Sequence, residues 1–329
     1  MSDRDAGGPP PRLPRRALLA VPALLLAPPA QAQWPERPVR LVVAFPPGSG
    51  TDVLARIVAP AFARELGQPV IIDNRPGGNG IVGTQGAAQA PADGHTLLVI
   101  STSAASINPH TFRRLPYDPL RDFAMIGSLA EGPYVFCVAP DNPARDLRGF
   151  LDRARERPAG ETTFSYGNAS ALIMSSMLGQ MAGIRMTPVP YRGGAEALAD
   201  VAAGRIDFTM ADFGPGTAQQ RGGRVRILGQ SLGRPFPVAP DIPPIATVLP
   251  GFDVNVWWGI AAPAATPPEI VQRANQALNA ALADATVLER LGQIGDLPLA
   301  MRPDEFTRYV ERQQVVWGER VRLAGIEPQ

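Results

Sequence analysis

The feature that most constrains this fold is an apolar strand that leads through a glycine- and proline-rich turn into a helix. The run Val39 to Ala44 is followed by Phe45-Pro46-Pro47-Gly48-Ser49-Gly50-Thr51-Asp52, and residues 52–66 have the apolar spacing of a helix. Such a turn leaves the first backbone N–H groups of the helix unpaired, so they can hold a small anion or carboxylate. Ser49 and Asp52 have the spacing of a capping box. These residues alone are equally compatible with an anion site and with a turn that is only well capped.

The first 32 residues have the layout of an export signal. The adjacent Arg15 and Arg16 precede the apolar run 17–29, and Ala30-Gln31-Ala32 has the A-x-A pattern of a cleavage site. We expect cleavage near Ala32 and a periplasmic mature protein of about 297 residues (329 − 32). The arginine pair fits either a twin-arginine or an ordinary secretory signal. The run is shorter than the about 20 residues of a membrane anchor.

Charge and cysteine content exclude several kinds of partner and cross-link. The 31 basic residues nearly balance the 30 acidic ones, which argues against a nucleic-acid or anionic-membrane partner. Cys137 is the only cysteine, so no intramolecular disulfide can form. It falls in an apolar run, where a thiol usually serves as a small core residue.

Strand-like and helix-like segments alternate along the chain, which predicts an α/β protein. Through residue 101 the strands are nearly continuous apolar runs separated by helices, which indicates a parallel sheet covered on both faces. The runs 134–139 and 256–262 enclose a second set of alternating elements. We therefore expect two lobes joined by two crossover strands. Lobe 1 would comprise residues 33–138 and 256–329, and lobe 2 residues 139–255.

The expected elements have the following bounds. Strands are predicted at 39–45, 70–73, 96–101, 134–139, 163–166, 187–191, 206–211, 225–230 and 256–262, and helices at 52–66, 81–90, 147–156, 172–181, 195–203, 268–283 and 304–324. The Met-rich helix 172–181 is expected to pack in the core, because methionines at helical spacing are most often core residues.

No recognisable catalytic or cofactor set is present in the sequence. Gly78 to Gly83 matches G-x-G-x-x-G after a strand, but position 103 is a serine where a ribose-binding acid would stand. We interpret these glycines as a turn that brings the backbone of residues 74–76 close to a cleft. His95 and His110 sit in turns without ligand partners at metal-binding spacing. We therefore expect no cofactor, no metal and no enzymatic activity.

Several motifs in order resemble the Bug family of extracytoplasmic solute receptors. They are Trp34-Pro35-Glu36-Arg37-Pro38, Phe45 to Arg56, Leu66 to Val70, Asn74-Arg75-Pro76-Gly77, Leu115 to Pro119, Ser165-Tyr166-Gly167, Val189 to Gly193, Gly204 to Asp207, Pro263 to Pro267 and Trp317 to Ile326. The resemblance covers essentially the whole mature chain. It implies a two-lobed fold of the type II periplasmic binding protein kind, with an interdomain cleft that captures a small carboxylate. It also implies a monomer that serves the membrane permease subunits of a tripartite tricarboxylate transporter.

The resemblance assigns ligand-binding residues on both sides of the cleft. Those of the first lobe are Phe45, Pro46, Pro47, Gly48, Ser49, Thr51, Asp52, Asn74, Ser101, Thr102 and Ser103; those of the second are Tyr166, Gly167, Asn168, Ala169, Ser170, Tyr191, Gly193 and Asp212.

One departure from the family pattern affects the expected pocket. After Ser165-Tyr166-Gly167 the loop is about four residues shorter than usual, and Leu172 stands where relatives have a histidine. A wider or less polar pocket is expected on that side, with Arg192 as a candidate extra anchor. The identity of the carboxylate cannot be transferred. Two alternatives remain open: a receptor that presents its ligand to a sensor protein, and an exported α/β enzyme.

Overall fold

A computed structural model describes residue 8 and residues 34–329 of the protein. Residues 34–329 form one compact unit. The expected export signal, with its cleavage site after Ala32, lies outside the described residues. Within the described part, no helix combines the length and the apolar character that crossing a membrane requires.

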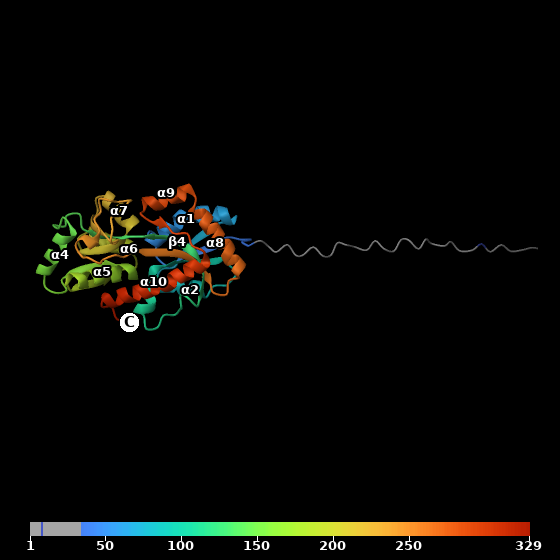
Figure 1. The fold of residues 1–329 in the computed structure, drawn as a ribbon, viewed down its shortest axis with the longest axis horizontal. Coiled ribbons are helices and arrows are strands. Elements are labelled where there is room, and N and C mark those ends of the chain that lie inside the picture. Colours follow the sequence, from blue (N-terminus) through green and yellow to red (C-terminus); the bar gives the residue numbers. More distant parts are fainter. Residues whose placement is uncertain (1–7, 9–33) are drawn as a thin grey trace, which may run out of the picture. The chain divides into compact units, whose positions relative to one another are not determined.

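The first sheet is mixed, with three parallel strands that continue into antiparallel ones (Figure 1). β1 is parallel to both β2 and β3, as expected from the sequence. β10 runs antiparallel to β3 and β4, and β11 antiparallel to β4. The strand β4, whose residues the sequence analysis did not assign, completes this half of the sheet. In spatial order the strands are β11 (Leu297–Pro298), β4 (Phe123–Gly132), β10 (Val256–Pro263), β3 (Thr96–Ser101), β1 (Val39–Val43) and β2 (Val70–Asn74).

The second sheet has the same mixture of directions. β6 is parallel to β7 and β8, whereas β5 is antiparallel to β8 and β9. Its spatial order is β7 (Met186–Pro190), β6 (Thr162–Tyr166), β8 (Phe208–Asp212), β5 (Tyr134–Val138) and β9 (Arg226–Gln230).

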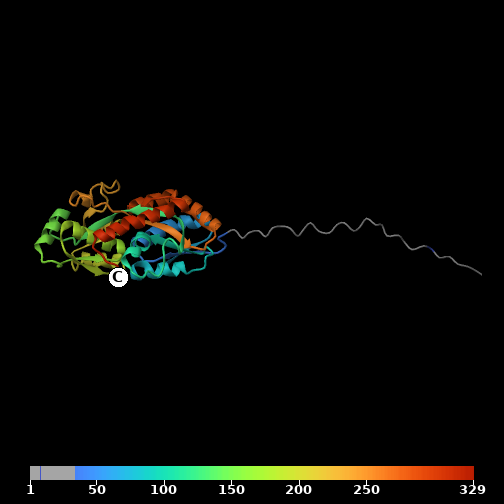
Figure 2. The same cartoon turned by 60° about the horizontal axis from the view of Figure 1, so that its bottom comes forward.

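Helices pack around both sheets. α10, drawn in red, contacts both β4 of the first sheet and α5 beside the second (Figures 1 and 2). Those associated with the first sheet are α1 (Gly50–Leu66), η1 (Gly78–Gly80), α2 (Ile81–Ala88), η2 (Ser103–Ile107), α3 (Asn108–Thr111), α8 (Pro268–Leu282), α9 (Ala285–Gln293) and α10 (Pro303–Leu323); those of the second are α4 (Leu147–Glu156), α5 (Ala169–Ala182), α6 (Gly194–Ala202), α7 (Phe213–Arg221) and η3 (Ile245–Thr247).

The chain passes from the first sheet to the second at Pro133, between β4 and β5. The sequence analysis placed residues 134–138 at the end of lobe 1, whereas the strand that they form belongs to the second sheet. Ser231 lies on the segment by which the chain returns to the first sheet. Its hydrogen bonds link this segment to the passage at Pro133. Its amide donates to the Tyr134 carbonyl at 2.9 Å, and its hydroxyl donates to the Val254 carbonyl at 2.6 Å. The bounds of the two lobes remain a prediction.

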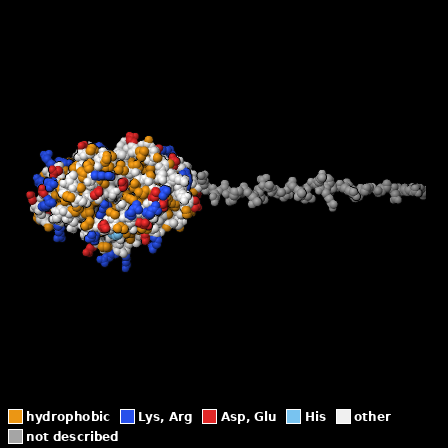
Figure 3. Space-filling model, viewed as in Figure 1, with side chains coloured by type: hydrophobic (Ala, Val, Ile, Leu, Met, Phe, Trp, Pro, Cys, Tyr) orange, Lys and Arg blue, Asp and Glu red, His pale blue; other side chains and the backbone are white. Residues whose placement is uncertain are grey.

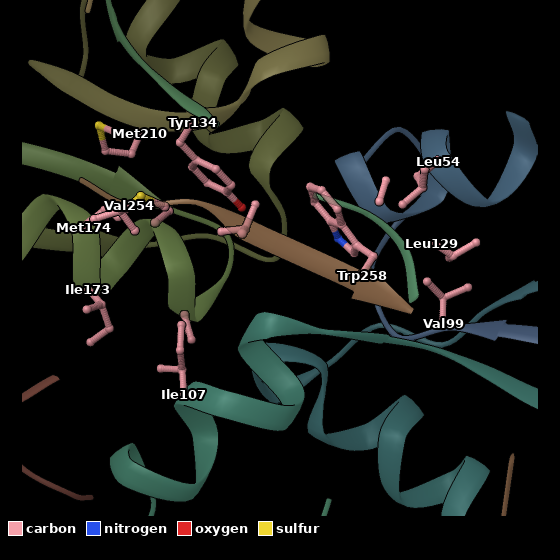
Figure 4. Close-up of a cluster of buried hydrophobic side chains, with 14 of the residues drawn as sticks. Leu54, Val99, Ile107, Leu129, Tyr134, Ile173, Met174, Met210, Val254 and Trp258 are labelled. Carbon is pink, nitrogen blue, oxygen red and sulfur yellow. The ribbon is translucent and has the colours of Figure 1, made fainter. Parts of the chain in front are cut away.

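One apolar cluster extends from the first sheet into the second. Figure 4 shows Leu54, Val99 and Trp258 on one side, and Met174 and Met210 on the other. Met174 is fully buried, so the expectation that the Met-rich helix packs in the core is confirmed. Cys137 is also fully buried, as expected, and burial raises the pKa of its thiol far above the ordinary value.

The surface carries both signs of charge. On the face shown in Figure 3, arginine and acidic side chains are interspersed among apolar ones. Several pairs are in contact, among them Arg64 with Asp284 at 2.6 Å and Arg157 with Asp207 at 2.7 Å. Exposed pairs of this kind contribute little to stability, about 0–1 kcal/mol each.

The second sheet has an aromatic core, so truncating one of its rings should lower the stability of the protein strongly. The Phe208 ring stacks on Phe136 with centroids 4.5 Å apart and meets Phe150 edge-on at 5.4 Å. Phe208→Ala should lower the free energy of unfolding in urea by about 3–5 kcal/mol, because it leaves a cavity in this cluster. Val315→Ala, at an exposed site on α10, is the control and should change it by less than about 0.5 kcal/mol. Equal effects of the two substitutions would contradict this packing.

Candidate functional site

The largest cavity described here lies where strand ends of both sheets meet. It has a volume of about 740 Å³. The first sheet contributes residues 45–46 and 76–80, which follow β1 and β2; the second contributes 166–167 and 190–192, which follow β6 and β7, with Glu196. Ligands in open α/β sheets bind outside the carboxyl ends of the strands, where the N-termini of the following helices favour negative charge.

The cavity wall combines aromatic rings with two charged side chains. Phe45, Tyr166 and Tyr191 supply the rings, and Arg192 and Glu196 the charges. The Tyr191 hydroxyl donates to Asp200 at 2.5 Å, which fixes that ring. None of the ion pairs formed among residues 34–329 uses Arg192, so its guanidinium is available to a ligand.

A much smaller cavity lies deeper between the sheets. Its volume is about 10 Å³, which is room for no more than about one water molecule. It shares Gly167 with the larger cavity. Segments that line it include residues 48–50 from the first sheet's side and residues 167–168, 194–195 and 209–212 from the second's.

The backbone amides of the first turn are mostly bonded within the chain. The Gly48 amide donates to Asp52 Oδ2 at 2.9 Å, and the Asp52 amide donates to Ser49 Oγ at 3.3 Å. Ser49 and Asp52 thus form a helix cap, as their capping-box spacing predicts. The Asp52 carboxylate accepts its hydrogen bond from the Gly48 amide. Ser49 donates its own amide to the Pro46 carbonyl at 3.2 Å. Four of the amides that the sequence analysis expected to be free for a ligand, those of Gly48, Ser49, Asp52 and Val53, therefore already have partners.

Asp52 and Asn74 stabilise this turn by hydrogen bonds. Asn74 donates to Asp52 at 2.9 Å and to the Phe45 carbonyl at 3.1 Å, and Arg56 donates to Asp52 at 3.0 Å. Burial alone would raise the pKa of Asp52, but the hydrogen bonds from Arg56, Gly48 and Asn74 outweigh it and lower the pKa. The buried carboxylate therefore stays ionised and holds the turn in shape.

Other predicted site residues do not line either cavity, and one pair of them connects the two halves. Ser103 and Ser170 share a hydrogen bond at 3.1 Å between their hydroxyls, which links η2 to α5. Thr102 exchanges hydrogen bonds with the Trp257 backbone. Ser101, like Ala169, is buried. Thr51 accepts a hydrogen bond from Trp258 Nε1 at 3.0 Å.

Glycines allow the two halves to approach closely. A Cβ atom on Gly193 would lie 2.8 Å from Pro46 Cγ across the cavity mouth, and one on Gly167 would lie 2.1 Å from the Gly193 carbonyl carbon. The glycine run after β2 has the expected role as a turn at the cleft, because residues 77–80 line the large cavity. Gly83 packs on the backbone of Arg75, where a Cβ atom would lie 2.6 Å from the carbonyl oxygen.

Asp212 lies between the two halves and lines the deeper cavity. It precedes α7 directly, and its carboxyl group lies against the start of α1, since a Cβ atom on Gly50 would be 2.5 Å from Asp212 Cγ. Burial raises the pKa of Asp212 to about 6, although the Tyr134 phenol and the Gly50 amide oppose this shift. Tyr134 in turn accepts a hydrogen bond from Asn168 at 2.9 Å.

Sequence reasoning missed three residues of the candidate site. The segment that carries Asp296 packs on the start of α7, next to Asp212, since a Cβ atom on Gly295 would lie 2.2 Å from Phe213 Cδ1. Burial raises the pKa of Tyr134 and of Asp296 well above their ordinary values. Gly50 was not singled out, although it makes the closest approach to Asp212. Asp296 offered one usable signal, because it is the lone charged residue within the segment Leu291 to Leu299.

The histidines lie outside this site. His110 Nε2 is 2.8 Å from the Gln314 carbonyl, and His95 is buried beside Glu36 and Asp93. Among the residues that the structure describes, no group of three or more metal-binding side chains gathers.

Comparison with known sequences identifies related proteins. Residues 54–326 match the model of the tripartite tricarboxylate transporter family receptor. A Pseudomonas protein from the tcbD–tcbE intergenic region is 36% identical over 288 residues, which are 85% of each chain. The protein BugT of Bordetella pertussis is 29% identical over 307 residues, or 92% of this chain and 93% of that one.

Solved structures show the same fold. The R. palustris protein Rpa4515 with adipate superposes with a TM-score of 0.87 at 31% identity, over 90% of this chain and 100% of that one. For the periplasmic binding protein BugD the TM-score is 0.86 at 28% identity, over 90% and 100%. For MatC of Rhodopseudomonas palustris with bound malate it is 0.82 at 29%, over 87% and 99%. The expected two-lobed binding-protein fold is thereby confirmed.

The contact between Gly50 and Asp212 can be tested by adding a methyl group. Gly50→Ala should lower the free energy of unfolding by about 1–3 kcal/mol, because the new Cβ atom overlaps the Asp212 carboxyl group. Gly292→Ala, with open space around it on α9, should be neutral or stabilising by up to about 1 kcal/mol. The Gly50→Ala/Asp212→Ala pair should recover part of the loss in urea unfolding, and a purely additive cycle would count against the contact.

Titration of Asp212 predicts a pH-dependent stability. Its pKa is raised above the ordinary value of 3.8 to about 6, so its contribution to stability is full below about pH 4 and is lost as the pH rises through about 6. Relative to Asp212→Asn, the ligand-free wild type should therefore lose on the order of 2 kcal/mol across that window. Urea unfolding at several pH values measures the difference, and parallel stability curves would refute the assignment.

Proposed function

Because the chain belongs to the tripartite tricarboxylate transporter receptor family, we propose that it captures a small carboxylate for a transporter of that kind. The chain is a Bug-type solute-binding receptor and not an enzyme, since the family and its structural neighbours are binding proteins. The adipate and malate of two neighbours support a carboxylate as the ligand. Capture would take place in the periplasm, with the permease subunits as membrane partners.

The observation that carries this proposal is the large cavity between the two sheets. Four helices, α1, α2, α5 and α6, begin beside it or its inner extension, and their N-termini favour an anion. Arg192 adds a full positive charge at its wall. A carboxylate can therefore be held by hydrogen bonds and by one guanidinium, without a metal ion.

The proposed ligand-binding set follows the cavity walls. Phe45, Pro46, Tyr166, Gly167 and Tyr191 line the large cavity. The deeper cavity is lined by Gly48, Ser49, Asn168 and Asp212, which would contact the ligand after a modest opening. Closure would be a hinge motion at the two passages near Pro133 and Ser231, between lobes 33–138 plus 256–329 and 139–255.

The cavity favours a ligand that is partly apolar. Sequence analysis attributed this property to Leu172, but that side chain is buried in the core and does not line either cavity. The aromatic rings of Phe45, Tyr166 and Tyr191, which line the large cavity, give it this apolar character instead. A second or third carboxylate would be costly there, because an unpaired buried charge costs several kcal/mol. A monocarboxylate or aromatic acid should therefore bind more tightly than a tricarboxylate.

Calorimetric titration with benzoate, adipate, malate and citrate tests this proposal. Citrate should bind most weakly of the four. Arg192→Ala should weaken the tightest of them about 10- to 100-fold, the range expected when a charged hydrogen-bond donor of about 1.5–3 kcal/mol is lost.

The matched control is Arg221→Ala, at an exposed arginine on α7, which should leave affinity unchanged. Failure of the wild type to bind any carboxylate would overturn the proposed function. Citrate binding tighter than the other acids would overturn the proposed preference alone.

A further inference from the structure

Two carboxyl groups that form no ion pair among the described residues lie between the sheets, one of them on the deeper cavity, and we propose that the receptor takes up a proton there when it binds a ligand carboxylate. The groups are Asp212 and Asp296. This inference rests on the proposed function, because it concerns the same cavity and the same class of ligand. It adds a proton as a second species that is captured with the acid.

Asp212 occupies the place that a ligand anion would prefer. Its carboxyl group lies against Gly50 at the N-terminus of α1, and a Cβ atom on Gly194, at the start of α6, would be 3.9 Å from Asp212 Oδ2. Helix N-termini attract negative charge, so the protein fills this position with a carboxylate of its own. An incoming carboxylate directed to the same helix ends would lie next to Asp212.

Asp296 brings a second carboxyl group to the same region. The preceding segment packs on the start of α7, where a Cβ atom on Gly214 would lie 2.9 Å from Ile294 Cβ. A Cβ atom on Gly132 would lie 2.4 Å from Asp296 Oδ1, so the carboxyl group faces the passage between the sheets. Asp296 is 5% exposed, and none of the side-chain hydrogen bonds found among residues 34–329 reaches its carboxyl oxygens.

The other titratable groups around this pair do not neutralise it. Tyr134, from β5, points from the second sheet toward β10 (Figure 4) and is a neutral phenol near pH 7, because burial raises its pKa. On α1, the charge of Asp52 is already matched by Arg56. Glu131 on β4 accepts a hydrogen bond from Asn255.

Two charged side chains remain on the large cavity. Arg192 and Glu196 lie at its outer wall, on the loop before α6 and on that helix. They flank the proposed ligand position and not the Asp212–Asp296 pair. None of the ion pairs found among residues 34–329 includes either carboxyl group; Arg234, which lines a separate cavity with Gly132 and Leu297 beside Asp296, is not paired with it.

Like charges in a buried site cannot all remain ionised. When two carboxylates share such a site, the pKa of one of them rises strongly, and the site holds a proton. Here a ligand carboxylate would add a third group to a pair in which the pKa of Asp212 already lies near 6. Protonation at the pair allows the ligand anion to approach the helix ends, so affinity should rise as the pH falls, by up to tenfold per pH unit for one proton.

Proton uptake can be counted by calorimetry on the whole mature protein. Binding of benzoate and adipate would be titrated at pH 7.0 in two buffers with different enthalpies of ionisation. The dependence of the observed heat on the buffer gives the number of protons exchanged. We expect net uptake of between about half a proton and one proton per ligand, and affinity that decreases from pH 6 to pH 8.

Asp212→Asn should abolish most of the uptake and make affinity nearly independent of pH. Glu311→Gln, an exposed acid-to-amide change on α10, is the matched control and should keep the wild-type proton count. Zero exchange by the wild type, or an unchanged count in Asp212→Asn, would overturn the inference while binding itself persists. Absence of binding to both acids would instead count against the proposed function. Should Asp212→Asn not fold, the wild-type count and its pH dependence still decide.

Discussion

The arrangement on which the rest depends is the meeting of strand ends from two separate sheets. β1, β2, β6, β7 and β8 all finish at the same cleft, and a helix starts after each. A parallel strand followed by a helix places unpaired N–H groups and a positive dipole end at that edge. Several such ends facing one another produce a positive potential in a chain whose charges are otherwise nearly balanced. The protein can therefore attract an anion without a cluster of basic residues.

That potential also acts on the chain's own acids. Asp52 is held ionised by its hydrogen bonds and stabilises the first turn. Asp212 lies on the opposite half and reaches the same helix end with a raised pKa. The two acids thus have opposite roles for one physical reason. Hydrogen-bond donors surround the first, whereas the second is desolvated beside another buried carboxyl group.

Close contact between the halves requires backbone without side chains. Pro46 meets Gly193, and Gly50 meets Asp212, at distances where a methyl group would overlap. These glycines let the two surfaces approach closely, and the cavity that Gly50 and Asp212 line there is small. The hydrogen bonds of Ser231 to Tyr134 and Val254 keep the two segments that connect the sheets together. A joint of this kind suits the hinge motion that capture requires.

The sequence by itself determined the local elements and the family. The apolar runs predicted β1, β3 and α4 to within a residue or two, and the Gly/Pro turn after β1 predicted both a helix start and its cap. These features depend on neighbours in the chain, so periodicity and turn chemistry reveal them. Motifs in order were sufficient to identify a Bug-type receptor.

Only the tertiary structure decided how the site is filled. In the structure the chain passes between the sheets at Pro133, Leu172 is buried in the core, and Arg192 and aromatic rings line the cavity. The tertiary structure also brought the segments that carry Asp212 and Asp296, 84 residues apart (296 − 212), into contact. Contacts between distant segments leave no periodic trace in a single sequence. Burial, which sets the pKa of these acids, is a property of the packed chain and not of any segment within it.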